Sequence, residues 1–328
     1  MNKEFRWGVI GTGGIARAFA KDLALAPGHR VTHFGSRTFA KAESVARDFS
    51  AIPVGSYQEL VELDVDAIYV ATPHSLHAEN AIMAMNAGKP VLVEKPFCVN
   101  AKQARAMISA SLSNQVALME AMWSRFLPHF REIREIVKRG EIGELISIQA
   151  DHGQPLPKDP YYRLHALELA GGALLDLGVY PISLTSMLLG TPSKIIAAGE
   201  INESGVDSQT SIIFTYPSGA HSIMNTTLLV RTPCTATIVG TLGRIEVDSN
   251  FYTPTSFRTI IGGKTLEYPN TYEGHGLREQ AIAFKDLVIS GKLENEIMSH
   301  AESLAIVEMM DEIRQQIKLI YPSNFFLS

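Results

Sequence analysis

Cysteine is scarce in this chain. Its 328 residues include two cysteines, Cys98 and Cys234, which lie far apart in the sequence. Two cysteines so placed cannot build a disulfide framework or a cysteine-rich zinc module. We therefore expect a protein of a reducing compartment, and the cytoplasm is the predicted location.

An excess of positive charge is also lacking. The chain has 29 Lys and Arg against 34 Asp and Glu, a formal net charge of -5. This balance offers no basic surface for a nucleic-acid backbone or an anionic membrane. The first residues lack the apolar core of a signal peptide, and no stretch runs 18 apolar residues without a polar break. We expect a small-molecule substrate as partner, with no nucleic acid and no membrane.

Hydrophobic residues make up 46% of the chain, enough to bury the cores of two domains. The first part alternates short apolar runs with helical patterns. Strands are expected at 6–10, 31–35, 67–71, 90–94 and 115–119, and helices at 15–26, 40–49, 76–87 and 101–111. This alternation predicts an α/β fold, a Rossmann-type doubly wound parallel sheet, for residues 1–121.

The pattern changes beyond residue 121, where β-rich segments follow one another. A hairpin is expected from 210–216 and 220–229, joined by Pro217-Ser218-Gly219. Further strands are expected at 234–239, 243–248 and 257–261, and helices near 127–139, 172–189, 277–290 and 301–318. Residues 122–328 are therefore predicted to form an α+β domain with a large, mostly antiparallel sheet that binds substrate.

A glycine-rich segment follows the first expected strand and opens the first helix. Gly11-Thr12-Gly13-Gly14-Ile15-Ala16 fits the G-x-G-x-x-G/A pattern of dinucleotide-binding proteins. Gly11 would allow the tight turn, Gly13 the approach of a pyrophosphate, and Ala16 close packing of the helix, whose N-terminus favours negative charge. The alternative is a glycine turn in an α/β domain without a ligand.

The residues after the second expected strand bear on the cofactor. NAD-binding proteins of this type carry an acidic residue about 20 residues beyond the glycines. Residues 31–42 contain no carboxylate, and the corresponding place is Gly35-Ser36-Arg37-Thr38. The hydroxyl of Ser36 and the guanidinium of Arg37, with Lys41, suit a 2′-phosphate, so NADP is predicted over NAD. The alternative is that Arg37 is a solvated surface residue.

Four segments together carry a resemblance to a known family. They are the glycine turn, Ala71-Thr72-Pro73-His74-Ser75-Leu76-His77, Glu94-Lys95-Pro96, and Gly171-Gly172-Ala173-Leu174-Leu175-Asp176-Leu177-Gly178-Val179-Tyr180. With these segments in this order, the chain resembles the glucose-fructose oxidoreductase/inositol dehydrogenase (Gfo/Idh/MocA) family over nearly all its length. Tyr180, where most members have His, and residues 120–126 are similar to the branch that contains dimeric dihydrodiol dehydrogenase and NADP-dependent D-xylose dehydrogenase.

The resemblance implies several features of the site. Lys95 would lie beside the nicotinamide, and the peptide bond before Pro96 would often be cis. Related proteins pair subunits through the free face of the second sheet, which implies a homodimer. The residues around these motifs that would contact the cofactor are Thr72, Pro73, His74, His77 and Glu94.

Three residues are candidates for catalysis. Lys95 follows a parallel strand at its carboxyl end, where such sheets collect ligands; position alone favours a solvated lysine, and the family resemblance favours the site residue. Asp176 and Tyr180 are four residues apart on an expected helix and share a face. A phenol has an unperturbed pKa of about 10, which a nearby ammonium lowers. We predict Tyr180 as acid/base, Lys95 as its activator and a substrate hydrogen bonder, and Asp176 as positioner of a second hydroxyl. The alternative is a helix N-terminal acid and a packed aromatic.

Other chemistry-bearing residues are less specific. His74 and His77 lack the carboxylates or H-E-x-x-H pattern of a metal site, so no metal is expected. Trp123, Arg125 and Phe126 follow the last strand of the first domain. Their rings and donors suit a sugar face or a cyclic diol, while core packing at the domain junction is the alternative.

The sequence thus predicts an NADP-dependent oxidoreductase that transfers a hydride between nicotinamide and a hydroxyl of a sugar, polyol or trans-dihydrodiol. Two other functions fit the same scaffold: a non-catalytic regulator that senses a nucleotide or sugar, and a glycoside hydrolase that recycles its nicotinamide. The presence of both Lys95 and Tyr180 argues against the regulator. The Ser36-Arg37 pair, which suits an exchanging NADP, argues against the hydrolase.

Overall fold

The computed structural model describes residues 4–157, 159 and 162–322. The chain divides into two compact units. Unit 1 contains the chain up to Trp123 and also Gly274–Leu304, while unit 2 contains Ser124–Glu273 and the chain from Ala305. The helix expected at 277–290 therefore belongs to the same unit as the Rossmann-type segment, although the sequence pattern placed it in the second domain.

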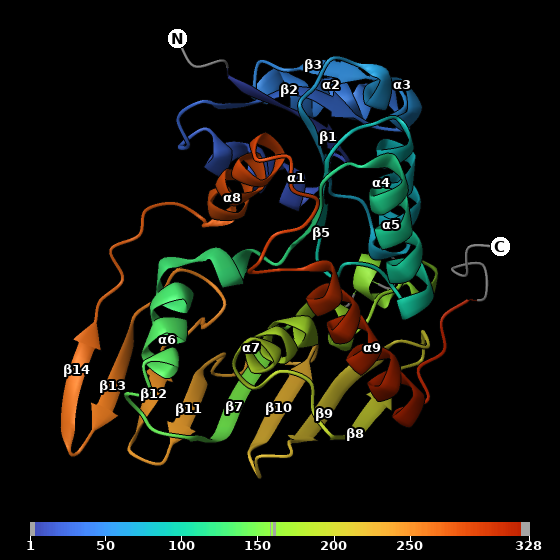
Figure 1. Ribbon diagram of the computed structural model, residues 1–328. Helices are drawn as coiled ribbons and strands as arrows, with labels where there is room; N and C mark the ends of the chain where they lie inside the picture. The colour runs from blue at the N-terminus through green and yellow to red at the C-terminus, as the bar shows by residue number, and fades with distance from the viewer. Residues whose placement is uncertain (1–3, 158, 160–161, 323–328) are drawn as a thin grey trace. The chain divides into compact units, whose positions relative to one another are not determined.

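Unit 1 is built on a six-stranded parallel sheet in the order β3-β2-β1-β4-β5-β6 (Figure 1). This is the strand order of a doubly wound dinucleotide-binding fold, and it confirms the predicted parallel sheet. The strands are β1 (Phe5–Ile10), β2 (His29–Gly35), β3 (Ile52–Val54), β4 (Ala67–Val70), β5 (Val91–Glu94) and β6 (Leu118–Ala121).

Helices connect these strands. The connecting helices are α1 (Gly14–Leu23), α2 (Phe39–Asp48), α3 (Tyr57–Glu62), α4 (His77–Asn86) and α5 (Ala101–Asn114). The returning segment adds α8 (Leu277–Ile289), which connects no strands of this sheet. The sequence pattern did not predict β3 or α3, because three and six residues are too few to display a period.

A cluster of rings joins the returning helix to unit 1. Trp7 on β1 is fully buried, with its ring centroid 5.4 Å from that of Phe19 on α1 and 5.7 Å from that of Phe284 on α8. Its Nε1–H donates to Nδ1 of His29 on β2 at 3.2 Å. Buried aromatic pairs of this kind stabilise packing beyond the area they bury, which explains why α8 belongs to unit 1.

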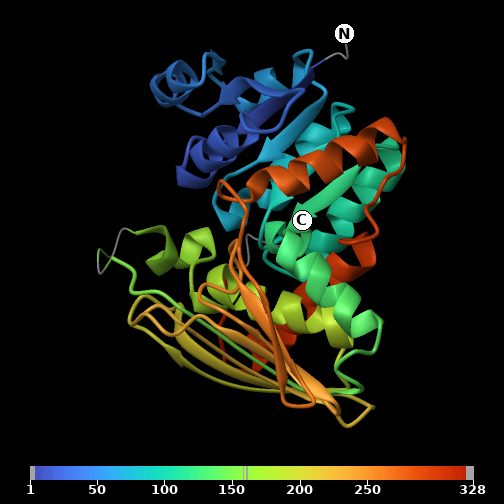
Figure 2. The ribbon, with the colours of Figure 1, turned by 90° about the vertical axis from the view of Figure 1, so that its left-hand side faces the viewer.

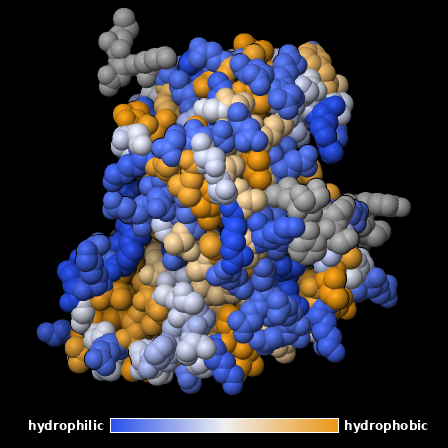
Figure 3. Space-filling view, turned by 45° about the vertical axis from the view of Figure 1, so that its right-hand side comes forward, coloured by the Kyte–Doolittle hydropathy of each residue, from blue (hydrophilic) through white to orange (hydrophobic). Residues whose placement is uncertain are grey.

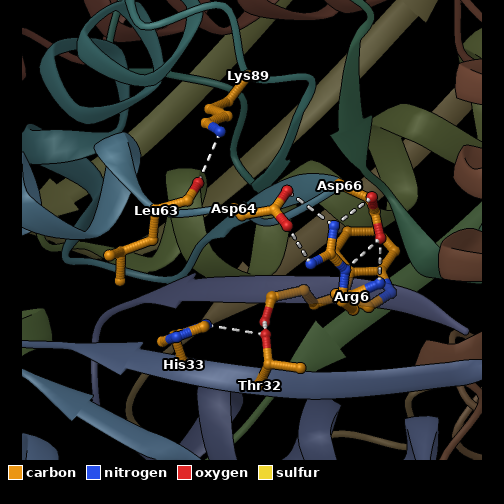
Figure 4. A network of polar contacts seen from close by, with 8 residues as sticks. Arg6, Thr32, His33, Leu63, Asp64, Asp66 and Lys89 are labelled. Carbon is orange, nitrogen blue, oxygen red and sulfur yellow. Dashed lines mark hydrogen bonds and ion pairs between the residues drawn. The ribbon is translucent and has the colours of Figure 1, made fainter.

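An arginine network holds the amino ends of two strands together (Figure 4). Arg6 on β1 donates from Nη1 to Asp64 at 2.7 Å and from Nη2 to Asp66 at 3.0 Å, and its backbone N–H donates to Asp66 at 2.7 Å. The two carboxylates raise the pKa of Arg6. Because Asp64 and Asp66 immediately precede β4, these bonds align β1 with β4 at the sheet edge opposite the glycine turn.

Unit 2 is built on an eight-stranded sheet in the order β14-β13-β12-β11-β7-β10-β9-β8. All neighbouring strands are antiparallel except β7 and β10, so the prediction of a mostly antiparallel sheet is confirmed. The strands are β7 (Leu145–Gly153), β8 (Lys194–Ile201), β9 (Asp207–Thr215), β10 (His221–Thr227), β11 (Ala236–Gly240), β12 (Gly243–Val247), β13 (Phe257–Ile261) and β14 (Lys264–Tyr268).

The hairpin of β9 and β10 lies where the sequence predicted it, but β7, β8 and β14 were not predicted. Polar, glycine or charged residues interrupt the apolar alternation in all three. The central position of β7 is set by pairing with β10 on one side and β11 on the other. That pairing joins segments about 70 to 90 residues apart, which local patterns do not report.

Helices cover one face of this sheet (Figures 1 and 2). They are α6 (Pro128–Lys138), the π-helical segment η5 (Leu174–Gly178) that runs directly into α7 (Val179–Leu189), and the part of α9 (His300–Gln316) from Ala305 onward, which belongs to unit 2. On β9 and β10, side chains alternate between buried and accessible positions. The buried ones, such as Ile212 and Met224, form the core beneath the helices.

One described helical stretch, Leu167–Leu189, is long and apolar enough to cross a membrane by length and composition. Within its most apolar window, 83% is buried inside the fold, as in a core helix.

On the face drawn in Figure 3, hydrophobic residues form separate groups among hydrophilic ones.

Candidate active site

The glycine turn after β1 brings three strand ends together. Gly11 has φ 114°, a conformation that favours glycine, and its N–H donates to the carbonyl of Gly35, the last residue of β2, at 3.1 Å. A Cβ at Gly11 would lie 2.4 Å from the carbonyl oxygen of Ala71 after β4. Only glycine therefore allows the backbone to pass between the ends of β2 and β4.

The N-terminus of α1 has the features of an anion site. Within the described chain, no side chain caps this helix and no acidic residue lies in its first turn. A Cβ at Gly13 or Gly14 would meet no described atom within 4 Å, so space is left beside the backbone. Ala16 is fully buried, as close packing of the helix requires. Free helical N–H groups and open space together fit a pyrophosphate.

The residues after β2 fit the 2′-phosphate of NADP. Ser36 is buried, and its Oγ accepts from the N–H of Thr38 at 3.3 Å. Arg37 is exposed, as is Lys41. Burial raises the pKa of Tyr57, whereas the charge of Arg37 and its hydrogen bond to the Tyr57 hydroxyl lower that pKa. The guanidinium of Arg37 therefore lies beside the Tyr57 hydroxyl. The site therefore offers a cationic fork and a second cation where an NAD site has a carboxylate.

His77 connects the loop after β4 to the loop after β5. Its Nδ1 lies 2.8 Å from the carbonyl oxygen of Pro96, and its Nε2 lies 2.9 Å from that of Thr72. Burial lowers the pKa of His77 to about 3, so the ring is neutral and donates to one carbonyl at a time. The ring of His74, also buried, lies 5.8 Å from that of His77. Cofactor contact by Thr72, Pro73, His74 and His77 stays a prediction.

Two buried carboxylates hold the loop that carries Lys95. Glu94 accepts from the hydroxyl of Tyr69 and, at 3.2 Å, from the N–H of Lys95. Glu120 on β6 accepts from the N–H of Phe97 at 3.0 Å. The Lys95–Pro96 peptide bond is cis, as the resemblance implied. Lys95 thus leaves the carboxyl end of β5 from a braced loop, although the sequence pattern did not single out Tyr69 or Glu120.

Asp176 and Tyr180 lie on the continuous helical segment formed by η5 and α7. Both residues are buried, with exposed fractions of 7% and 5%. The carboxylate of Asp176 accepts from Nη2 of Arg163 at 3.1 Å. Arg163 was not a sequence candidate, because no pattern indicates that residues 13 apart across a loop will pair. Its partner Asp176 is held in one orientation, which suits a group that positions a hydroxyl.

Aromatic rings surround Tyr180 in unit 2. The ring centroids of His152 and Tyr252 lie 5.3 Å and 4.8 Å from that of Tyr180, and these two rings stack on each other at 4.0 Å. The amide nitrogen of Gln154 donates to the hydroxyl of Tyr252 and lies 2.8 Å from Nε2 of His152. His152 Nδ1 lies 3.2 Å from the carbonyl of Leu177, so this nitrogen carries the hydrogen.

The sequence did not identify His152, Gln154 or Tyr252 as site residues. The first two lie on or just after β7, a strand that was itself not predicted, and Tyr252 lies in a turn between β12 and β13. Sheet pairing brings them to Tyr180. The only available signal was the two-residue spacing of His152 and Gln154 in a strand, which is too common to be informative.

The remaining sequence candidates are engaged within their own units. The ring of Trp123 lies 5.1 Å from that of His275 in unit 1. Arg125 is buried in unit 2, where its Nε and Nη2 donate to the hydroxyl and carbonyl oxygens of Ser183 on α7, both at 2.7 Å. Phe126 is fully buried. Substrate contact by these three residues stays a prediction.

Among the residues described, no group of three or more His, Cys, Asp or Glu side chains is placed to hold a metal ion.

A parallel sheet in this strand order, with a glycine turn leading into α1, defines the class of dinucleotide-binding α/β proteins. Two family models match the chain: the NAD-binding Rossmann fold of an oxidoreductase family at residues 5–122, and the GFO/IDH/MocA C-terminal domain at residues 130–246. The chain belongs to the GFO/IDH/MocA family and is an oxidoreductase.

Named relatives match over nearly the whole chain. A trans-1,2-dihydrobenzene-1,2-diol dehydrogenase from Xenopus laevis is 36% identical over 332 residues, 97% of this chain and 99% of that protein. A D-xylose 1-dehydrogenase (NADP(+)) from Hypocrea jecorina is 32% identical, over 97% of this chain and 93% of that protein. The crystal structure of a 3-ketoreductase from Actinomadura kijaniata, in complex with NADP and TDP-benzene, is 28% identical with a TM-score of 0.86, covering 96% of this chain and 98% of that chain.

Proposed function

We propose that this protein is an NADP-dependent oxidoreductase that transfers a hydride between nicotinamide and a hydroxyl-bearing carbon of a sugar, polyol or trans-dihydrodiol. Relatives named for dihydrodiol and D-xylose oxidation support this substrate class. The observation that most supports it is that Tyr180 and Asp176 are both buried on one helical segment, with the rings of His152 and Tyr252 packed against Tyr180. Such rings suit the apolar face of a sugar or a cyclic diol.

Each residue has a proposed role in the oxidation direction. The cofactor, when bound, supplies the hydride acceptor. The Tyr180 oxygen removes the proton of the substrate hydroxyl, so that the carbon losing its hydride becomes a carbonyl. The ammonium of Lys95 favours the phenolate of Tyr180 and donates to the substrate oxygen. Asp176, held by Arg163, accepts from a second substrate hydroxyl.

The first test is formation of reduced nicotinamide, followed by absorbance, when the protein meets NADP+ or NAD+ with a panel of aldoses, inositols and trans-dihydrodiols. We expect reduction of NADP+ with at least one member. If NADP+ binds and nothing in the panel is oxidised, the proposal fails and the regulator gains support. Release of sugar from a glycoside without net NADPH would favour the hydrolase.

Replacing Arg37 with alanine is expected to weaken NADP+ binding about 100-fold while changing NAD+ binding little. The guanidinium would be the main partner of the 2′-phosphate, and a charge-assisted bidentate pair contributes about 2 to 3 kcal/mol. Isothermal titration with both cofactors measures the two affinities. Arg47→Ala, which removes an exposed arginine in the last turn of α2, is the control. Equal weakening of both cofactors by Arg37→Ala would exclude the 2′-phosphate role.

We also propose that the protein works in the cytoplasm as a homodimer formed through the open face of the unit 2 sheet. Three isoleucines, Ile196, Ile213 and Ile223, are direct neighbours across β8, β9 and β10. Their exposed fractions are 44%, 39% and 50%. A contiguous apolar row on an uncovered sheet face is the kind of surface that pairs with a second copy. Both cysteines are free and buried, in keeping with a reducing compartment.

Replacing Ile213 with lysine tests the dimer. It places a charge at the centre of the isoleucine row, so the protein is expected to be monomeric at micromolar concentration, where the parent is dimeric. Light scattering after gel filtration measures the mass. Leu112→Lys changes an apolar residue on α5 that is more exposed, at 50%, and is expected to stay dimeric. A dimeric Ile213→Lys variant, or a monomeric parent, would contradict the proposed interface.

A further inference from the structure

The turn that precedes the helical segment of Asp176 and Tyr180 is held by side chains from distant parts of unit 2. The hydroxyl of Tyr321, beyond α9, donates to the carbonyl oxygen of Gly171. The hydroxyl of Thr226 on β10 donates to the carbonyl oxygen of Ala173 at 3.3 Å. The N–H of Leu174, the first residue of η5, donates to Oδ2 of Asp207 on β9 at 2.8 Å. The start of the segment is therefore set by tertiary contacts.

Asp207 is the charged member of this set. Its side chain is fully buried, and Thr210 donates to the same Oδ2 at 2.8 Å. Its Oδ1 has no hydrogen-bond partner among the described residues. A Cβ at Gly172, where φ is 113°, would lie 2.1 Å from Oδ1, so the carboxylate packs directly on the backbone of the turn. A glycine at 172 is required by this contact as well as by its φ.

A buried carboxylate at this place has a physical effect on the helix that follows. The first N–H groups of a helix have no partner within it, and its N-terminus is the positive end of the helix dipole. Within the described chain, no residue next to η5 caps it with a side chain. Asp207 on β9 supplies that cap by accepting from the N–H of Leu174. Leu174 lies two residues before Asp176 and six before Tyr180.

We propose that Asp207 is a positioning residue of the oxidoreductase reaction, whose ionised carboxylate fixes the helical segment that presents Asp176 and Tyr180 to the substrate. This proposal rests on the function proposed above for those two residues. Asp207 acts through the backbone of Leu174 and the turn at Gly172, and it touches neither substrate nor cofactor.

The ionisation of Asp207 makes its role measurable. Burial raises the pKa of Asp207 to about 6, and the hydrogen bond from Thr210 is the first of several that oppose this rise. Among the described residues, Tyr321 is a titratable group that faces Asp207; burial raises its pKa well above its usual range, so it stays neutral. Arg314, 5.2 Å from the ring of Tyr321, is the charged neighbour from α9. Activity should therefore fall as the pH decreases through about 6, where Asp207 gains a proton.

The first test is Asp207→Asn, which keeps the shape and an acceptor for Leu174 but removes the charge. We expect kcat to fall about 10-fold, the equivalent of one charge-assisted hydrogen bond, with little change in NADP+ affinity. The fall in activity as the pH decreases through about 6, which we call the acidic limb of the pH profile, should disappear. Asp151→Asn, which alters a carboxylate that accepts from the N–H groups of Cys234 and Thr235, is the matched control and should keep both kcat and limb. Unchanged kcat in Asp207→Asn, or persistence of its acidic limb, would overturn the proposal.

The second variant, Thr210→Val, keeps the charge and removes one donor to Oδ2. Because that donor lowers the pKa of Asp207, its loss should move the acidic limb to higher pH, a shift that a structural defect alone would not cause. A limb at the parent's position would count against the proposal.

Hydrogen exchange separates this proposal from the proposed function. If the parent turns over no substrate, the function proposed above is wrong. Faster exchange of amides 171–180 in Asp207→Asn than in Asp151→Asn would then still show that Asp207 holds the segment. Equal exchange in the two variants would show that it does not.

Discussion

Replacing Tyr180 with phenylalanine is expected to lower kcat about 1000-fold while leaving NADP+ affinity within about twofold of the parent, because a general acid/base typically contributes 100- to 10,000-fold. The ring, and with it the packing against His152 and Tyr252, is retained. Only the hydroxyl that would exchange a proton with the substrate is lost. Steady-state kinetics on the substrate found in the cofactor-reduction assay, with a separate titration of NADP+, measures both quantities.

Tyr252→Phe is the matched control for this prediction. It removes a hydroxyl from the same ring cluster, where that hydroxyl accepts a hydrogen bond from Gln154. The loss of one neutral hydrogen bond corresponds to about 1 kcal/mol, so kcat should stay within about 10-fold of the parent. If Tyr180→Phe retains the turnover of this control, the acid/base role belongs to another group.

Replacing Gly11 with alanine is expected to destabilise unit 1 by about 3 kcal/mol and to abolish measurable NADP+ binding. The new Cβ would lie 2.4 Å from the carbonyl oxygen of Ala71, and the φ of 114° is strained for any residue with a side chain. Both effects move the strand ends on which the cofactor would lie. Urea unfolding and titration with NADP+ measure stability and affinity.

Gly13→Ala separates the two effects. A Cβ at Gly13 would meet no described atom within 4 Å, and the backbone there has ordinary φ of -75°. Stability should therefore be nearly unchanged, while NADP+ binding weakens because the methyl group occupies space that a pyrophosphate would approach. Equal loss of stability in the two variants would show that the turn is not constrained by Ala71. Normal NADP+ binding by Gly13→Ala would remove this helix end from the cofactor site.

Much of unit 1 could be predicted because its information is local. Each βα unit is a short apolar run followed by a segment in which apolar residues recur about every 3.6 residues, as in a helix. Because such helices cross over the sheet, the strands that they connect run parallel. Gly11, Arg37 and Lys95 follow strands β1, β2 and β5, so their common sheet edge could be inferred. Even there, the return of α8 to pack on Trp7 could not be inferred, because it joins residues more than 270 apart.

Unit 2 was less predictable because its contacts are long-range. The hairpin of β9 and β10 has a local turn signal, whereas β7 between β10 and β11 depends on pairing across 70 or more residues. The site shows the same division. That Asp176 and Tyr180 lie on one helical segment could be predicted, but Arg163 on Asp176 and the rings of His152 and Tyr252 around Tyr180 could not.

The sequence by itself determined the parallel sheet of unit 1, the glycine turn into α1, the lack of a carboxylate after β2 and the helical segment that carries Asp176 and Tyr180. These features depend on backbone periods and neighbours within a few residues. Only the tertiary structure decided which groups surround them: the carboxylates that hold the Lys95 loop, the ring cluster at Tyr180 and the buried Asp207 at the start of its helix. Their positions come from packing between distant segments, whose free energy is absent until the whole unit has folded.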